Sequence, residues 1–150
     1  MTPRIDLTKY MSSGLGRAMF GLSSEAAARP EPRLFELVKI RASQINGCAY
    51  CIDMHTKDAR AVGETEQRIY ALPAWREAPF FSERERAALA FTESVTEVAT
   101  THVPVADYDA VAAQFSPDEV AALLSLIVAI NAWNALAVST RAWAPGSYER

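Results

Sequence analysis

Two cysteines and a histidine lie within one short stretch of the sequence, at a spacing that suits redox chemistry. Cys48 and Cys51 are the two cysteines of the chain, and His55 follows about one helical turn after Cys51. On a helix that begins near Cys48, these three side chains and Asp58 fall within an arc of roughly 80°. Residues three apart on a helix have Cα atoms about 5–5.5 Å apart, a separation that a disulfide can span. The stretch therefore predicts a redox site in which the two cysteines can form a disulfide.

Either cysteine could be the reactive thiol. A cysteine with a pKa of about 8.5 is only ~3% thiolate at pH 7, so a reactive one needs a neighbour that favours its anion. The positive end of the helix dipole favours a thiolate at Cys48. His55, at i+4 from Cys51, can instead accept the proton of Cys51 or pair with its thiolate. Geometry alone leaves the choice between the two cysteines open. We assign the nucleophile to Cys51, because a hydrogen-bonded base is the more specific activator. Cys48 then has the resolving role and forms the disulfide with the oxidised sulfur.

The segments around this stretch predict an all-α fold of about seven helices, because no alternating strand pattern appears. The predicted helices span about residues 7–28, 32–45, 48–62, 65–72, 82–99 and 103–115, and a last one begins at Pro117. A break is expected at 29–32 and a loop at 73–81, and the sequences after Ser82 and Ser116 predict helix caps. The two cysteines thus lie at the start of the third predicted helix. A chain of 150 residues suits one domain.

A carboxylate on the second predicted helix is expected to lie beside His55. Glu36 lies ten residues before Asn46, about 15 Å along its helix, and His55 lies nine residues after it, about 13.5 Å. If Asn46 and Gly47 form a short turn, the two helices make an antiparallel hairpin that places Glu36 level with His55. There the carboxylate can orient the imidazole and raise its basicity, directly or through a water. Asp58 competes for the same role from the helix of His55.

The order Glu36, Cys48, Cys51, His55 resembles the E-x11-C-x2-C-x3-H signature of the AhpD-like alkylhydroperoxidases, in the carboxymuconolactone decarboxylase superfamily. The flanking residues also look like those of the single-domain members, so that the resemblance covers roughly residues 32–141. It implies an all-helical domain and a homo-oligomer, commonly a trimer or hexamer. It also implies Cys51 as the peroxidatic thiol, Cys48 as the resolving thiol, and His55 with Glu36 as the proton relay.

The expected function is that of a thiol peroxidase that reduces organic hydroperoxides and is recharged by an external dithiol or protein reductant. This cycle requires no cofactor and no bound metal. One alternative is a non-catalytic redox sensor or binding module, which would oxidise once where a peroxidase would cycle. Another is a structural zinc domain with Cys48, Cys51, His55 and His102 as ligands. Zinc is disfavoured, because three ligands on consecutive turns of one helix wrap poorly around a tetrahedral ion.

The charges and the cysteines of the sequence indicate which partners to exclude and in which cellular compartment to expect the protein. The net charge is −3 at pH 7, and no basic block appears, which argues against a nucleic-acid partner. Residues 1–22 contain Arg4, Asp6, Lys9 and Arg17, so they do not form the apolar core of a signal peptide. With its cysteines confined to one C-x-x-C, the chain is expected in a reducing cytoplasm.

The last predicted helix carries no charge from Val120 to Val138, which is near the length of a membrane span. Ser125, Asn131 and Asn134 interrupt this run. We therefore expect a buried central or subunit-interface helix and no membrane span. Its polar residues would need partners there, which oligomerisation could supply. Trp133 on this helix is expected to be a core residue, with lining of a substrate pocket as the alternative.

Overall fold

The computed structural model describes residues 2–27 and 31–150, and within these ranges all regular structure is helical. The predicted all-α class is confirmed. The helices are α1 (Thr8–Met11), α2 (Gly14–Ala27), α3 (Pro32–Ile45), α4 (Ala49–Ala61), α5 (Glu66–Ala71), the 3₁₀ turn η1 (Leu72–Ala74), α6 (Glu83–Thr96), α7 (Val98–Thr101), α8 (Val105–Gln114) and α9 (Pro117–Thr140). Residues 28–30, on which the end of the first predicted helix and part of the predicted break fall, lie outside the described residues.

Two predicted helices are each divided in the structure. The segment predicted at 7–28 contains α1 and α2, and a Cβ atom on Gly16 would lie 1.7 Å from the carbonyl oxygen of Met11, so only glycine fits this close turn. The segment predicted at 82–99 ends at Thr96 and is followed by the short α7. The helix that begins with the cysteines, third in the prediction, is consequently α4.

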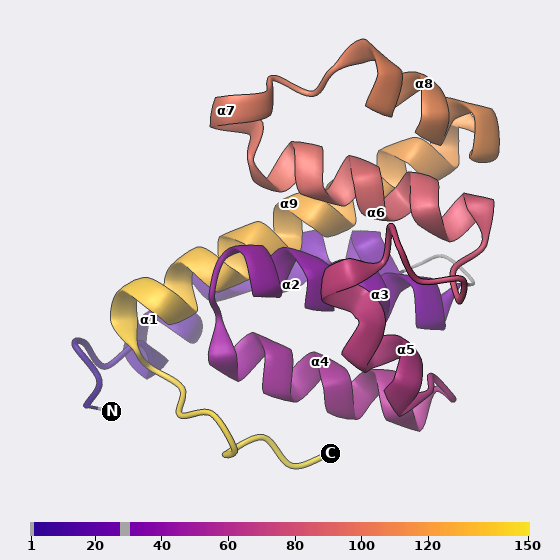
Figure 1. Ribbon diagram of the computed structural model, residues 1–150. Coiled ribbons are helices and arrows are strands. Elements are labelled where there is room, and N and C mark those ends of the chain that lie inside the picture. The colour runs from indigo at the N-terminus through magenta and orange to yellow at the C-terminus, as the bar shows by residue number, and fades with distance from the viewer. Residues whose placement is uncertain (1, 28–30) are drawn as a thin grey trace.

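Helix α3 lies at the centre of two apolar clusters. Figure 1 shows α4, α3, α6 and α8 stacked in turn. One side of α3 packs against α6 and α9 through a cluster that includes Val38, Phe91 and Ile127 and that α8 completes from the far side of α6. Its other side packs against α4, η1 and α6 through Leu37, Leu72 and other buried residues. α3 is therefore held from both sides, and it can position side chains rigidly.

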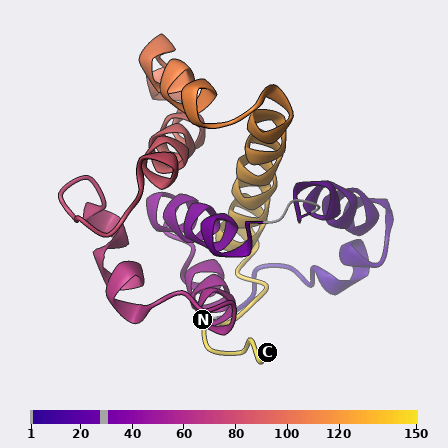
Figure 2. The ribbon, with the colours of Figure 1, turned by 90° about the vertical axis from the view of Figure 1, so that its right-hand side faces the viewer.

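Helix α9 crosses this stack and lies between α2 and α3, as Figure 2 shows. Among the described residues it is the helix that is long and apolar enough to cross a membrane, with a mean hydropathy of 1.9. It nevertheless packs along its length against α2, α3 and α6. The expectation of a central helix is met.

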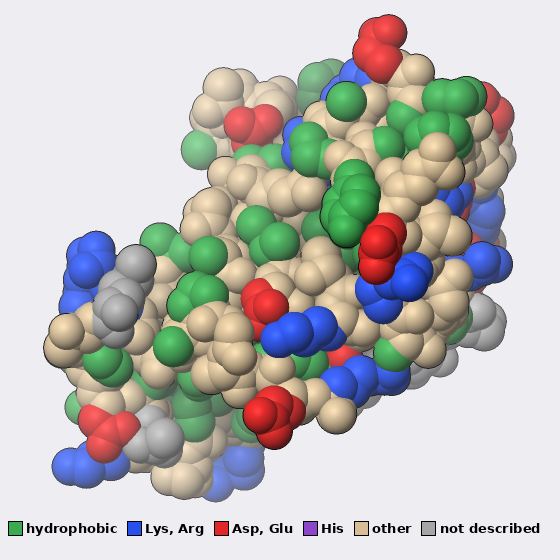
Figure 3. Space-filling view, turned by 60° about the horizontal axis from the view of Figure 1, so that its bottom comes forward, with side chains coloured by type: hydrophobic (Ala, Val, Ile, Leu, Met, Phe, Trp, Pro, Cys, Tyr) green, Lys and Arg blue, Asp and Glu red, His purple; other side chains and the backbone are tan. Residues whose placement is uncertain are grey.

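The predicted caps are present. Ser82 and Glu85 form a complete capping box at the start of α6, and Ser116 and Glu119 form one at the start of α9. On the face shown in Figure 3, the Lys and Arg side chains lie among Asp and Glu side chains and do not gather into one basic surface.

Candidate redox site

The turn between α3 and α4 sets the geometry of the site. Asn46 ends α3, Gly47 adopts a left-handed conformation with φ +66°, and Cys48 is the N-cap of α4. A side chain at a positive φ of this kind is strained, so glycine suits the position. The resulting hairpin brings Glu36 beside His55 as predicted, with 2.9 Å between Glu36 Oε2 and His55 Nδ1.

Cys48 and Cys51 are joined by a disulfide, with their Cα atoms 5.3 Å apart. Both are buried, at 2% and 3% exposed. The backbone N–H of Cys51 donates to Sγ of Cys48 at 3.3 Å, so the helix terminus already offers a donor to that sulfur. Cys51, in contrast, borders a cavity together with His55. The helix terminus thus contacts Cys48, whereas His55 shares a cavity with Cys51.

Both carboxylate oxygens of Glu36 are engaged. While Oε2 pairs with His55, Nζ of Lys39 donates to Oε1 at 2.6 Å. Burial alone would raise the pKa of Glu36, but the hydrogen bond from His55 and the charge of Lys39 outweigh it, and the pKa lies below its ordinary value of 4.5. Glu36 is thus held as an anion next to the imidazole. Lys39 was not predicted as part of the site, although its position at i+3 from Glu36 could have indicated it.

Asp58 lies near this pair but has other partners. Its Oδ1 accepts a hydrogen bond from the hydroxyl of Tyr148 at 2.9 Å and pairs with Arg150 at 3.3 Å. Glu36, His55 and Asp58 each offer one side-chain atom that could bind a metal ion, and these three atoms all lie within 4.8 Å of one another. Because Lys39 and Arg150 already balance the two carboxylates, the chain supplies its own cations to this cluster.

His102 is not part of the site. It ends α7, is exposed, and adopts a left-handed conformation with φ 53°. Figure 1 places α7 at the opposite end of the helix stack from α4. The set Cys48, Cys51, His55 and His102 considered for zinc is therefore not assembled.

A cavity of about 830 Å³ opens beside Cys51 and His55. Residues from the N-terminal segment, α2, α4, α9 and the C-terminal segment line it, including Phe20, Tyr50 and Trp133. Trp133 lines this cavity, which was the alternative to the core position expected from the sequence. Its Nε1 donates to Ser23 Oγ on α2 at 2.9 Å. Burial, followed by the charge of Asp53, raises the pKa of Tyr50, so its phenol stays neutral at physiological pH.

The C-terminal segment runs along α4 and closes one side of the cavity. Nζ of Lys57 donates to the carbonyl oxygen of Tyr148 at 2.9 Å, and Oδ2 of Asp53 accepts from the backbone N–H of Gly146 at 3.1 Å. Trp143 of this segment stacks on Tyr50 and covers the disulfide together with Ala137. The two sulfurs are thus shielded from solvent by chain that lies far from them in sequence.

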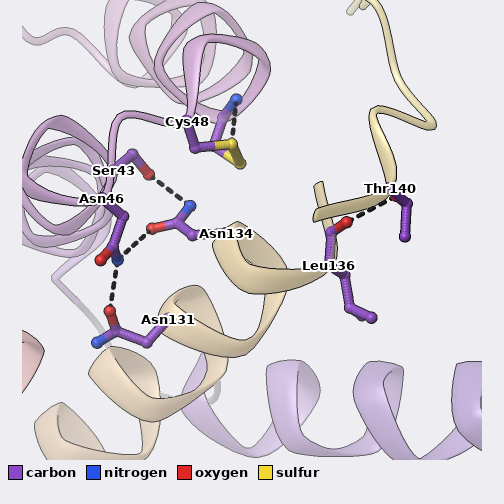
Figure 4. Close-up of a disulfide and its surroundings, with 8 residues drawn as sticks. Ser43, Asn46, Cys48, Asn131, Asn134, Leu136 and Thr140 are labelled. Carbon is purple, nitrogen blue, oxygen red and sulfur yellow. Dashed lines mark hydrogen bonds between the residues drawn. A yellow bond between two sulfur atoms is a disulfide. The ribbon is translucent and has the colours of Figure 1, made fainter. Parts of the chain in front are cut away.

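Buried amides tie the turn before Cys48 to α9 (Figure 4). Asn134 points from α9 toward the turn, where Nδ2 donates to Ser43 Oγ at 3.0 Å and Oδ1 accepts from Asn46 at 2.9 Å. Asn46 also donates to Asn131 at 2.6 Å. The polar residues of α9 therefore find partners within the chain, where the sequence analysis had looked to oligomerisation.

Comparison with known proteins places the chain in a family. The profile of the carboxymuconolactone decarboxylase family matches residues 14–94, which are 81 of the 150 residues. The chain belongs to this family. The uncharacterized protein YdfG of Bacillus subtilis (strain 168) is 48% identical over 104 residues, which cover 69% of this chain and 71% of YdfG.

Solved structures agree with this membership. ATU0492 from Agrobacterium tumefaciens is 38% identical to this chain and superposes on it with a TM-score of 0.89. It is a protein of unknown function that has been suggested to be the antioxidant defence protein AhpD. The match covers 96% of this chain and 99% of ATU0492. The chain is thus an AhpD-like member of the family. The debrominase Bmp8 shares the fold, with a TM-score of 0.78 and 20% sequence identity. This match covers 97% of this chain and 79% of Bmp8.

Proposed function

We propose that this chain is a thiol-dependent peroxidase that reduces organic hydroperoxides through a Cys48–Cys51 disulfide cycle. One observation carries the proposal: Cys51 and His55 border the same cavity, and His55 is paired with the buried anion of Glu36. A base next to a thiol that faces a substrate-sized cavity is the arrangement that nucleophilic thiol chemistry needs. The likeness to AhpD-like proteins supports an antioxidant role.

The first half of the cycle is oxidation of Cys51. His55 accepts the proton of the Cys51 thiol, and Glu36 stabilises the imidazolium that forms. The thiolate attacks the terminal oxygen of the hydroperoxide, the O–O bond breaks, and the leaving alkoxide takes the proton from His55. The products are an alcohol and a sulfenic acid on Cys51.

The second half restores the thiols. The sulfur of Cys48, whose anion is favoured by the N–H of Cys51, attacks the sulfenic sulfur and releases water as the disulfide forms. An external dithiol then gives up two electrons and two protons, becomes a disulfide itself, and returns Cys48 and Cys51 to thiols. A sensor would need only one such oxidation, so turnover with excess dithiol separates the two functions.

The test is mass spectrometry of Cys48→Ser after one equivalent of cumene hydroperoxide in the presence of a sulfenic-acid trap, with wild type and Cys51→Ser in parallel. We expect rapid trapping on Cys51 in the first variant and an intramolecular disulfide in wild type. Trapping on the cysteine of Cys51→Ser instead would assign attack to Cys48. Reaction no faster than that of a free thiol in both variants would refute the peroxidase.

The proposal takes residues 1–150 as one domain that acts in the cytoplasm as a homo-oligomer, commonly a trimer or hexamer in such proteins. An exposed apolar face of α9 supports self-association, since Leu124, Val128 and Val138 lie on one side of the helix and are at least 40% exposed. Light scattering of wild type should give a multiple of 16.4 kDa, and Val128→Asp should lower it. A monomeric wild type would contradict the oligomer.

A further inference from the structure

Four aromatic rings form one continuous wall of the cavity beside Cys51. Phe20 contacts Trp133 with ring centroids 5.5 Å apart, Trp133 contacts Trp143 at 6.0 Å, and Trp143 contacts Tyr50 at 5.7 Å. The rings come from α2, α9, the C-terminal segment and α4. Segments that lie far apart in the sequence therefore converge on a single aromatic surface.

This wall is held in place but is not buried. The indole of Trp133 is fixed by its hydrogen bond to Ser23, and Trp143 is fixed by its stacking on Tyr50. Phe20, at the outer end of the wall, is nevertheless 59% exposed. Aromatic side chains contribute most when their faces are covered, and a pair of rings gains affinity beyond the area that it buries. The wall thus has room for another ring.

The other residues that line the cavity favour an uncharged ligand. Besides His55, three charged side chains, Arg4, Asp6 and Lys39, border the cavity, and each already has a partner within the chain. Arg4 Nη1 donates to Ser139 O at 3.1 Å, and Lys39 pairs with Glu36. Apolar side chains such as Met54 and Ile130 line the cavity as well. With a volume of about 830 Å³, the cavity falls in the range of pockets that hold drug-sized organic ligands.

We infer that this cavity binds the organic part of the substrate, and that the substrate is a neutral hydroperoxide that carries an aromatic ring. The ring packs against the wall formed by Phe20, Trp133, Trp143 and Tyr50, and the peroxide group points to Cys51 and His55. This inference rests on the proposed function for the reacting group. The binding of the ring itself requires no chemistry, so it can be measured separately.

The binding test uses alcohols, which are the reaction products and cannot oxidise the protein. Cumyl alcohol carries a phenyl ring, and 2-cyclohexyl-2-propanol has the same carbon skeleton without aromaticity. Titration is followed by NMR of the indole N–H signals. We expect those of Trp133 and Trp143 to shift and that of Trp75 to stay, because Trp75 lies in another cluster and donates to Glu93. Cumyl alcohol should bind about two- to tenfold more tightly.

A matched pair of variants tests the wall. Trp143→Leu should weaken cumyl alcohol binding by about two- to tenfold, whereas Tyr70→Leu, which removes a 74% exposed ring outside the cavity, should leave it unchanged. Equal affinity for the two alcohols, or equal binding by the two variants, would overturn the inference.

Turnover separates this inference from the proposed function. If cumyl alcohol binds with the expected shifts but cumene hydroperoxide is not reduced, the aromatic site stands and the peroxidase falls. If aromatic and cyclohexyl hydroperoxides are reduced at the same rate, and the indole N–H signals do not shift, the peroxidase stands and the aromatic site falls. Where both hold, the cyclohexyl hydroperoxide should show a higher KM than cumene hydroperoxide at similar kcat.

Discussion

At the scale of single residues, the candidate site depends on how Glu36 divides its two oxygens. One oxygen pairs with His55 and the other with Lys39. The carboxylate therefore cannot rotate away without losing a charged partner, and the imidazole that it holds keeps one ring nitrogen engaged. The position of Glu36 could be predicted from helix geometry, because ten and nine residues on either side of a tight turn give nearly equal rises. The contact to Lys39 required a side-chain rotamer that spacing does not specify.

The first prediction concerns Glu36→Gln. The amide keeps the shape of the side chain but removes the charge that stabilises the imidazolium of His55. We expect oxidation of Cys51 by cumene hydroperoxide to slow by about tenfold to a hundredfold, as measured by stopped-flow trapping of the sulfenic acid. Glu97→Gln, an exposed position at the end of α6, is the matched control and should react like wild type. An unchanged rate in Glu36→Gln would remove this carboxylate from the relay.

At the scale of elements, α9 fixes the turn that carries Cys48. Asn134 is 1% exposed and bonds to both Ser43 and Asn46, so it links the end of α3 to the central helix. The sequence could indicate that polar residues on an apolar helix need partners, but it could not identify them, since the partners lie 88 and 91 residues away. For the same reason the cavity wall, which joins four distant segments, has no local pattern in the sequence. Helix caps and the α3–α4 hairpin, which depend on neighbouring residues, could be predicted.

The second prediction concerns Asn134→Ala. The change leaves the buried hydroxyl of Ser43 without its partner, removes one of the two acceptors of Asn46, and opens a small cavity. The free energy of unfolding should therefore fall by about 2–4 kcal/mol. Urea denaturation at pH 7 measures the loss. Ser125→Ala serves as the control, because its hydroxyl bonds only to the carbonyl of Ala121 on the same helix, and it should change stability by less than about 0.5 kcal/mol. Equal stability of the two variants would show that the network contributes little.

At the scale of the whole molecule, buried or half-buried carboxylates join the helices. Glu93 on α6 accepts from Arg41 of α3 and from the indole of Trp75. Burial alone would raise the pKa of Glu93, but its hydrogen bonds from Trp75, Arg76 and Arg41 lower it below 4.5. The pKa of Glu36 is lowered as well. Several helix contacts therefore depend on the same charged state.

The third prediction is a loss of stability in acid. Since these carboxyls bind protons less readily in the folded chain than in the unfolded chain, their contribution is complete above about pH 4.5 and is lost as the pH falls through their folded pKa values. Urea denaturation between pH 7 and pH 3 should show a flat region and then a decline. Glu93→Gln should have lower stability at pH 7 and a shallower decline. A decline of unchanged slope would mean that Glu93 does not contribute to the effect.

The position of α9 in the chain has a consequence for biosynthesis. A ribosome makes this helix after α1 to α8, yet it supplies Leu123 and Ile127 to one core cluster and Ala137 to the cover over the disulfide. Until α9 has left the exit tunnel, the nascent chain carries an unfinished core and two uncovered thiols. The cysteines gain their full shield only after α9 and then Trp143 have docked, so both thiols stay open to oxidants while translation continues.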